Sequence, residues 1–419
     1  MSLQDLSTER EWYERDLLAR FLRYVQVHTT SDPHVAVTPS TERQFDLARM
    51  LEAELRELGV LDVTLDENCR LIARLPGKGA EEDATPIGFM AHVDTAPDFS
   101  GENVRPQVHE SYDGGPISLN DEHQLDPDSY PMLLHYTGET IITTDGTTLL
   151  GADDKAGIAE IMTAVRFLIA HPEIPRPPIE IIFTPDEETG RGMNGFPVEK
   201  LQSKFCFTMD GTDEGGIEAA CFTAYRVSAE FTGYSIHPGS ARGKLANAAS
   251  MAAQFVAMLP RSESPEATDG DFGFYCPTEI TGSISAARVN TIVRDFNHEE
   301  AKRRLAFLEQ LARTVEGAFP GGRIKLETTR QYLNMADFLE PHPHVVDNIS
   351  EAIRATGMEP SVHKIRGGTD GARLSEMGIP TPNIFTGGQN LHGRFEWIAL
   401  PAMVRAAKTV VNLAYLFSK

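Results

Sequence analysis

Cysteine is scarce in this chain, with four among 419 residues. Cys69, Cys206, Cys221 and Cys276 lie far apart, and no two of them form a Cys-x-x-Cys pair. This spacing argues against a disulfide framework and against a zinc site built on paired thiolates. We expect the four thiols to be reduced and to serve in packing.

The chain also lacks long apolar runs and an excess of positive charge. No apolar run approaches the roughly 20 residues that cross a bilayer. Residues 1–23 alternate charged and apolar side chains without a basic segment followed by an apolar stretch, so we expect no export signal and a cytoplasmic location. With 38 basic and 61 acidic residues, the net charge of −23 argues against binding to nucleic acid or to an anionic membrane.

The chain is long enough for two domains. Its 419 residues are too many for one compact core, and a hydrophobic fraction of 41% suffices to bury two. Predicted strands and helices alternate through the first half, which indicates an α/β architecture. One helix is expected over residues 41–58, with a capping box formed by Thr41 and Gln44 and with Gly59 as its C-cap.

Five acidic or imidazole side chains lie where short apolar runs end in turns that contain glycine or aspartate. The runs that we expect to be strands cover residues 87–91, 179–184, 205–209 and 383–385. Strand ends converge at one edge of a sheet, so residues far apart in the sequence can share one cleft. Two imidazoles and three carboxylates suit zinc, or less selectively manganese or cobalt. The five residues are His92, Asp153, Glu188, Asp210 and His392.

Five ligands exceed what one tetrahedral zinc requires, so they predict two ions roughly 3.5–4 Å apart that share a carboxylate. Asp153 is the best candidate for the bridge, because it lies in the turn at 151–157 that opens a helix. The apolar spacing from Ile158 to Ile169 predicts that helix. Backbone N–H groups at its start can steady a carboxylate held nearby.

Glu187 and Glu188 are adjacent, and neighbouring side chains point in different directions. One of them can bind metal while the other acts as the general base that takes a proton from the attacking water. We assign Glu187 as the base and Glu188 as the ligand, although adjacency alone does not fix that order. Asp94, two residues after His92, is expected to accept the imidazole N–H and to fix its tautomer.

Each of these residues also has an ordinary structural explanation. A single histidine is more often hydrogen-bonded than metal-bound. Asp153-Asp154 before a helix is usually an N-cap pair, and Glu187-Glu188 before Thr-Gly is usually a solvated turn. Five such coincidences at strand ends favour a metal site over surface decoration.

The chain closely resembles a known family over nearly its whole length. The most specific stretches are His92-Val93-Asp94-Thr95 and residues 143–146 with 151–157, 183–188, 365–371, and 385–388 with 392–393. On these stretches the chain is similar to the co-catalytic dizinc metallopeptidases, above all to their tripeptide-cleaving aminopeptidases. That family also includes acetylornithine deacetylase, succinyl-diaminopimelate desuccinylase and carnosine-type dipeptidases.

The resemblance implies the distribution of the metal ligands. His92 and Asp210 would complete one zinc site, Glu188 and His392 the other, and Asp153 would bridge them. The cofactor would be two zinc ions per subunit, with manganese or cobalt as substitutes.

The resemblance also implies roles for neighbouring residues. Asp94 would orient the ligand histidine, and Glu187 would be the proton acceptor. The peptide between Asp153 and Asp154 would be cis. The chain departs from the family pattern at Thr212-Asp213-Glu214, which is more acidic than the glycine-rich form.

Ligand candidates are absent between Asp210 and His392, and the composition changes after about Ala220. We therefore predict a catalytic domain formed by residues 1–220 and 330–419 and an inserted domain at 221–329. The predicted fold class is α/β, a mixed-sheet catalytic domain with helices on both faces plus a smaller α+β insertion. The resemblance implies that the insertion is a lid or dimerisation domain, so we expect a homodimer formed through it.

Two residues of the predicted insertion are candidates for substrate binding. His237 precedes a proline and a glycine, which hold its backbone extended or in a turn, and it can reach a tetrahedral oxyanion. Arg294 offers a planar fork matched to the carboxylate of a short free peptide. A turn histidine without a role and a surface arginine are the alternatives. The resemblance favours the functional interpretation for His237.

These features predict a dinuclear zinc aminopeptidase that removes the N-terminal residue from tripeptides. Its partner would be a short peptide. A dizinc amide hydrolase of the same group, either a dipeptidase or an N-acyl-amino-acid deacylase, is the nearer alternative, because the metal site is common to all of them. A metal-stabilised binding protein without activity is the farther one. Glu187 argues against it, because binding alone gives no reason for an unligated carboxylate beside Glu188.

Overall fold

The computed structural model describes residues 9–419, and the first eight residues of the N-terminus, for which we expect no export signal, lie outside that range. The chain divides into two compact units. The first contains the chain up to Ala219 together with Phe338–His363 and Thr369–Lys419, and the second contains Ala220–Asp337 and Lys364–Gly368. The predicted insertion, residues 221–329, falls inside the second unit, which also takes Ala220 and residues 330–337 and 364–368.

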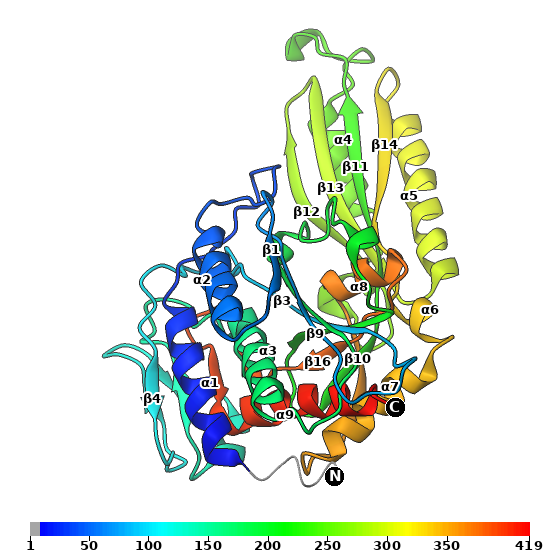
Figure 1. The fold of residues 1–419 in the computed structure, drawn as a ribbon. Helices are drawn as coiled ribbons and strands as arrows, with labels where there is room; N and C mark the ends of the chain where they lie inside the picture. Colours follow the sequence, from blue (N-terminus) through cyan, green and yellow to red (C-terminus); the bar gives the residue numbers. More distant parts are fainter. Residues whose placement is uncertain (1–8) are drawn as a thin grey trace. The chain divides into compact units, whose positions relative to one another are not determined.

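The first unit is built on a mixed eight-stranded sheet with the order β1-β2-β8-β3-β9-β16-β10-β15 (Figure 1). Its central strands β8, β3, β9 and β16 run parallel, and β1, β2 and β10 pair in the antiparallel sense. β3 and β8 are buried along their whole length, as strands covered on both faces are. The strands are β1 (Asp62–Leu65), β2 (Leu71–Leu75), β3 (Ile87–His92), β8 (Ile179–Thr184), β9 (Phe205–Gly211), β10 (Gly216–Cys221), β15 (Ser361–Ile365) and β16 (Asn383–Phe385).

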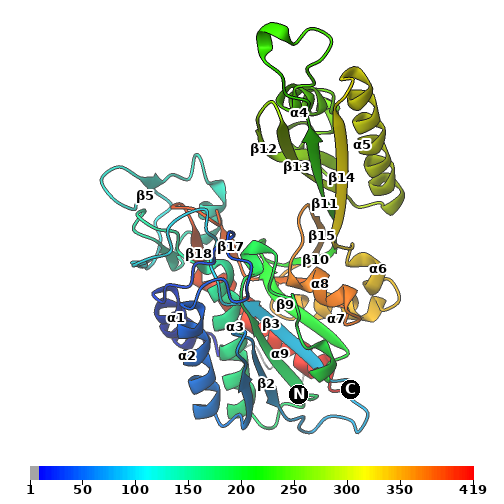
Figure 2. The same ribbon diagram turned by 90° about the horizontal axis from the view of Figure 1, so that it is seen from above.

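Helices cover both faces of this sheet, as the sequence predicts (Figure 2). On one face the ring of Phe207 meets Phe417 at the end of α9, and α3 packs on β3 and β9. On the opposite face Met90 and Cys206 form a core cluster with Leu374 of α8. The helices of the unit are α1 (Arg10–Val25), α2 (Gln44–Glu57), α3 (Ala152–Ala170), α7 (Pro343–Arg354), α8 (Asp370–Glu376) and α9 (Leu400–Leu416).

Two smaller sheets complete the first unit around a separate core that contains Trp397. One has the strand order β17-β18-β7-β4, and the other is the pair β5 and β6. Their strands are β4 (Gln107–His109), β5 (Ile117–Ser118), β6 (Gln124–Leu125), β7 (Ile141–Thr143), β17 (Gly388–Gln389) and β18 (Trp397–Ala399).

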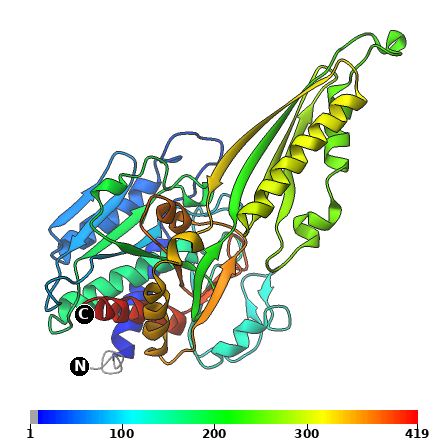
Figure 3. The ribbon, with the colours of Figure 1, turned by 90° about the vertical axis from the view of Figure 1, so that its right-hand side faces the viewer.

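The second unit is a four-stranded antiparallel sheet with the order β12-β13-β11-β14. Helices α4 and α5 pack on one face and bury a core that includes Phe231, Phe255 and Val289 (Figure 3). The elements are β11 (Thr223–Thr232), α4 (Ala248–Ala257), β12 (Phe274–Gly282), β13 (Ala286–Asp295), α5 (His298–Ala318) and β14 (Arg323–Tyr332), followed by the short α6 (Ala336–Leu339). No helix within residues 9–419 is long and apolar enough to cross a membrane.

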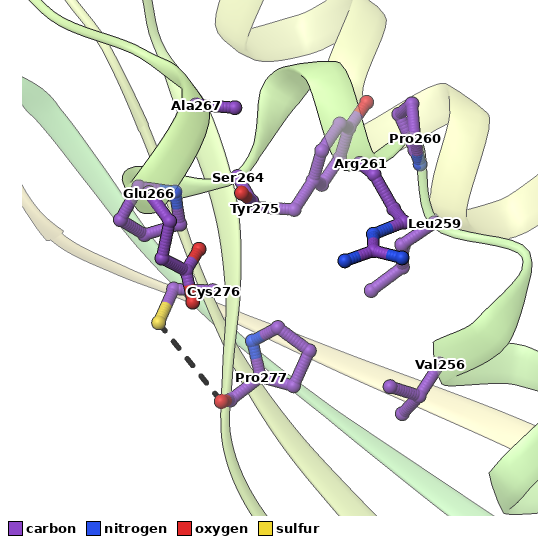
Figure 4. Close-up of a pocket in the computed structure, with 11 residues that line it drawn as sticks. Val256, Leu259, Pro260, Arg261, Ser264, Glu266, Ala267, Tyr275, Cys276 and Pro277 are labelled. Atoms are coloured by element: carbon purple, nitrogen blue, oxygen red, sulfur yellow. Dashed lines mark hydrogen bonds between the residues drawn. The ribbon is translucent and has the colours of Figure 1, made fainter.

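A cavity of about 440 Å³ opens in the second unit, beside the loop that follows α4 (Figure 4). Arg261, Glu266, Tyr275 and Cys276 contribute to its wall. No residue predicted to act in catalysis or binding lines it. Its position therefore gives no support to a role in the predicted reaction.

The capping box predicted at the start of α2 is wrong. The helix begins at Gln44, and no side chain caps it. The Thr41 hydroxyl donates to the carbonyl of Thr30 at 2.9 Å, and the Gln44 side chain turns toward Asp186. The predicted C-terminal end is confirmed, because Gly59 has φ +86° and the N–H of Val60 donates to Leu55.

Candidate metal centre

The five predicted ligands come together at the carboxyl ends of the parallel strands. His92 ends β3, Asp210 is the next-to-last residue of β9, and Glu188 follows β8. Asp153 lies at the start of α3, and His392 follows β17 with φ +63°. The ligand atoms form two overlapping clusters, in each of which they lie within 4.8 Å of one another. Asp153 belongs to both clusters.

Asp153 presents its two carboxylate oxygens to two different histidines. Its Oδ1 lies 3.0 Å from Nε2 of His92, and its Oδ2 lies 3.1 Å from Nε2 of His392. Nε2 of His392 is also 3.1 Å from Oε2 of Glu188, and Nε2 of His92 is 3.7 Å from Oδ1 of Asp210. Each oxygen of Asp153 therefore faces the histidine of a different cluster. The peptide between Asp153 and Asp154 is cis, as the resemblance implies.

The donor set fits two divalent cations. Oε1 of Glu188 is buried and has no hydrogen-bond partner among the residues that the structure describes. Burial raises the pKa of Glu188 to about 8, and burial also raises the pKa of Asp210. Hydrogen bonds with Asp153 and Glu188 raise the pKa of His392 to about 11. The raised pKa values of Glu188 and Asp210 show that these two buried carboxylates are short of compensating positive charge, which divalent cations held beside them would supply.

Glu187 lies beside the clusters at the start of the 3-10 turn Glu187–Thr189. Desolvation raises the pKa of its carboxyl well above the usual range, and the charge of Asp210 adds to the shift. A raised pKa suits a carboxylate that takes up a proton near neutral pH. Within residues 9–419, no protein group forms a hydrogen bond with the carboxylate of Glu187.

Asp94 links the strand end at His92 to the turn that carries the two glutamates. It is fully buried, and its carboxylate accepts the backbone N–H of Glu187 at 3.0 Å and that of Glu188 at 3.3 Å. Nδ1 of His92 lies 3.1 Å from the carbonyl oxygen of Asp94 and 3.3 Å from its Oδ1. A proton on Nδ1 would thus be held by Asp94, which leaves Nε2 of His92 directed to Asp153.

Sequence reasoning missed Glu396. This buried carboxylate accepts the backbone N–H groups of Leu150, Gly151 and Asp153, at 2.7, 2.9 and 3.2 Å. These backbone donors therefore hold the carboxylate of Glu396, a residue far away in the sequence. Glu396 is a lone acid before the short strand β18, so no local pattern distinguishes it from a surface residue.

Two further buried carboxylates also escaped assignment. Oδ2 of Asp154 accepts the backbone N–H of His92 at 3.1 Å. Asp370 accepts the hydroxyl hydrogen of Thr184 at 2.7 Å, and burial raises its pKa to about 7. Both residues lie in stretches that carry the family resemblance, so the sequence drew attention to them without indicating what they do.

His237 and Arg294 belong to the second unit. Nδ1 of His237 accepts the N–H of Gly239 at 3.1 Å, so a neutral ring carries its proton on Nε2. The imidazole is exposed. Arg294 is only 9% exposed, donates to the carbonyls of Tyr225 and Val293 at 3.2 Å, and stacks on Tyr332. These contacts are structural, and the substrate roles of both residues stay predictions.

Comparison with known proteins identifies the family. Residues 143–416 match the model of peptidase family M20/M25/M40. Over 408 residues the chain is 47% identical to peptidase T of Geobacillus kaustophilus, covering 97% of this chain and 99% of that protein. The chain belongs to peptidase family M20/M25/M40 and is a peptidase.

Two solved structures are similar to the whole chain. Aminopeptidase PepT from Bacillus cereus superposes with a TM-score of 0.76 at 25% identity, covering 97% of this chain and 99% of that one. The YXEP protein of Bacillus subtilis, described as a dinuclear metal-binding peptidase of the M20 family, superposes with a TM-score of 0.65 at 16% identity, covering 97% and 98%. The second likeness concerns the fold alone.

Proposed function

We propose that this peptidase is a dinuclear zinc aminopeptidase that removes the N-terminal residue from tripeptides. The observation that carries the proposal is the carboxylate of Asp153, whose two oxygens face His92 and His392 at 3.0 and 3.1 Å. His92 and Asp210 would hold one ion, and Glu188 and His392 the other. The naming of the 47% identical relative as peptidase T supports the choice of substrate class.

His92, Asp153, Glu188, Asp210 and His392 would hold the two zinc ions, which would supply Lewis acidity to lower the pKa of a water molecule and to polarise a peptide carbonyl. Glu187 takes the proton of the attacking water and passes it to the leaving amine. Desolvation raises the pKa of Glu187, which favours uptake of the proton by its carboxylate. No covalent intermediate with the protein is needed.

Asp94 would hold the turn with the two glutamates and the ring of His92 in fixed relative positions. Its carboxylate holds the backbone of Glu187 and Glu188 while its carbonyl oxygen faces Nδ1 of His92. The base and one ligand would therefore move together. Such partners commonly change metal affinity or activity about 10–100-fold when they are removed.

The second unit would supply substrate contacts. His237 would donate its Nε2 proton to the oxyanion that forms at the scissile carbon, and Arg294 would bind the carboxylate of the peptide. The proposal includes a homodimer formed through the second unit and a cytoplasmic location, as the sequence predicts.

A substrate panel tests the proposal. Enzyme stripped with a chelator and restored with zinc is given a free dipeptide, tripeptide and tetrapeptide and an N-acetylated tripeptide. Release of the N-terminal residue from the free tripeptide alone, and only after zinc is restored, is the expected result. Cleavage of the acetylated peptide or the dipeptide alone would assign a sister activity, and no cleavage of any would favour a binding protein.

A further inference from the structure

Asp186, the residue before Glu187, has an unusual combination of backbone and environment. Its φ of +57° and ψ of +24° place it in the left-handed region, which a residue with a side chain adopts only where the surroundings stabilise it. Its side chain is fully buried. Neighbouring groups must therefore stabilise both the turn and the carboxylate.

Ser40 and Gln44 meet that requirement from a distant part of the chain. The backbone N–H of Ser40 donates to Oδ2 of Asp186 at 2.7 Å, and its hydroxyl donates to Oδ1 at 2.5 Å. The Gln44 carboxamide both donates a hydrogen bond to Asp186 and accepts one from it. Its Nε2 donates to Oδ1 of Asp186 at 2.8 Å, and its Oε1 accepts the backbone N–H of Asp186 at 3.1 Å.

The segment that contains Ser40 and Gln44 also binds the loop after His92. The N–H of Ser31 donates to the carbonyl of Thr95 at 3.2 Å, and the hydroxyls of Thr30 and Thr95 lie 3.1 Å apart. Residues 30–44 thus connect the loop that follows one predicted ligand to the turn that carries the predicted base.

We infer that Gln44 is a positioning residue for the proposed peptide hydrolysis. By holding Asp186 in the left-handed turn, it sets the direction in which Glu187 and Glu188 leave β8. Gln44 acts through Asp186 and not by contact with substrate. The expected effect of Gln44 on kcat rests on the proposed function, whereas its expected effect on the turn at Asp186 does not.

The two-way hydrogen bonding makes the carboxamide hard to replace. Glutamate has the same shape but loses the donor and places a second carboxylate against Asp186. Methionine fills a similar volume without a strong hydrogen-bonding group. Asparagine is one methylene shorter, so it cannot reach the N–H and the carboxylate from the same backbone position.

The test compares Gln44→Glu, Gln44→Met and Ser40→Ala with Asn412→Asp. Asn412 is a matched control, because it is 3% exposed and its amide donates to the carbonyl of Ala352 between α9 and α7. The measurements on the metal-loaded enzyme are the melting temperature, kcat and KM for a free tripeptide, and the visible absorption spectrum after cobalt replaces zinc.

For the Gln44 variants we expect kcat to fall about 10–100-fold with KM changed less than about threefold, and the cobalt spectrum to shift. Asn412→Asp is expected to lower the melting temperature while kcat and the cobalt spectrum stay as in the wild type. Ser40→Ala removes one hydrogen bond to Asp186 and is expected to lower kcat in the same direction by a smaller factor. If the Gln44 variants do not fold, the kcat and the cobalt spectrum of Ser40→Ala decide whether the inference holds.

Folded Gln44 variants with wild-type kcat and an unshifted cobalt spectrum would overturn the inference. An equal loss of kcat in Asn412→Asp would also overturn it, because the effect would then be general destabilisation. If the wild type does not cleave the tripeptide, the proposed function fails, and the cobalt spectrum alone decides whether Gln44 positions the turn.

Discussion

The backbone N–H of Glu187 donates a hydrogen bond to the carboxylate of Asp94 at 3.0 Å. The two residues come from the ends of adjacent parallel strands, β3 and β8. Since Asp94 also lies 3.3 Å from Nδ1 of His92, the position of the proposed base depends on the same carboxylate that faces a proposed ligand. Removal of that carboxylate should therefore disturb base and ligand together.

Asp94→Asn should lower both kcat and zinc affinity. An amide has one oxygen, so it cannot accept from Glu187 and Glu188 with two separate oxygens as the carboxylate does. A decrease of about 10–100-fold in kcat is expected, with weaker binding of zinc in a calorimetric titration. Asp121→Asn, at an exposed loop position, is the control. Wild-type kcat and zinc affinity in Asp94→Asn would show that the link is not used.

Glu187→Gln should retain both metal ions and lose turnover. The amide keeps the size of the side chain but cannot take up the proton, and a loss of about 10²–10⁴-fold in kcat is expected. Metal content per chain and kcat are measured on the same preparation. Glu188→Gln is the matched comparison, since it should lose metal as well as activity. Retained activity in Glu187→Gln would refute the assignment of the base.

The strands that position the site were predictable from the sequence. Strands β3, β8, β9 and β16 correspond to the apolar runs at 87–91, 179–184, 205–209 and 383–385. Each run is recognisable because a strand that is buried on both faces is apolar throughout, and because each run ends in a turn. Parallel pairing then brings His92 and Asp210 to one sheet edge. Their assignment as ligands remains a prediction that the geometry supports.

The residues that hold the ligands in place were not predictable in the same way. Gln44 looked like part of a local capping box, but its side chain serves Asp186, more than a hundred residues away. Glu396 accepts the N–H groups of Leu150 and Gly151, just before α3, and of Asp153 in its first turn. Such contacts depend on how distant segments pack, and single-sequence patterns describe only neighbours along the chain.

Glu160 of α3 provides a prediction about stability. Its side chain is fully buried, neither carboxylate oxygen has a hydrogen-bond partner among the described residues, and burial raises its pKa well above the usual value. The folded protein therefore binds this proton more tightly than the unfolded chain. The stability that depends on it is complete below about pH 4.3 and decreases as the pH rises toward the folded-state pKa.

Glu160→Gln removes that dependence, because the amide is uncharged at every pH. The variant should melt above the wild type near pH 7.5, and the difference should shrink near pH 5. Glu57→Gln, at the exposed end of α2, is the control and should change stability by less than about 0.5 kcal/mol. An equal melting temperature of Glu160→Gln and wild type at both pH values would contradict the prediction.

The most direct test of a dinuclear site is a zinc titration of chelator-stripped protein that is monitored in parallel by calorimetry and by tripeptide hydrolysis. The wild type should bind two zinc ions per chain and gain activity as they bind. Asp153→Asn should impair both sites, because Asp153 belongs to both ligand clusters. Full tripeptide hydrolysis without metal, or two unchanged zinc sites in Asp153→Asn, would contradict the account.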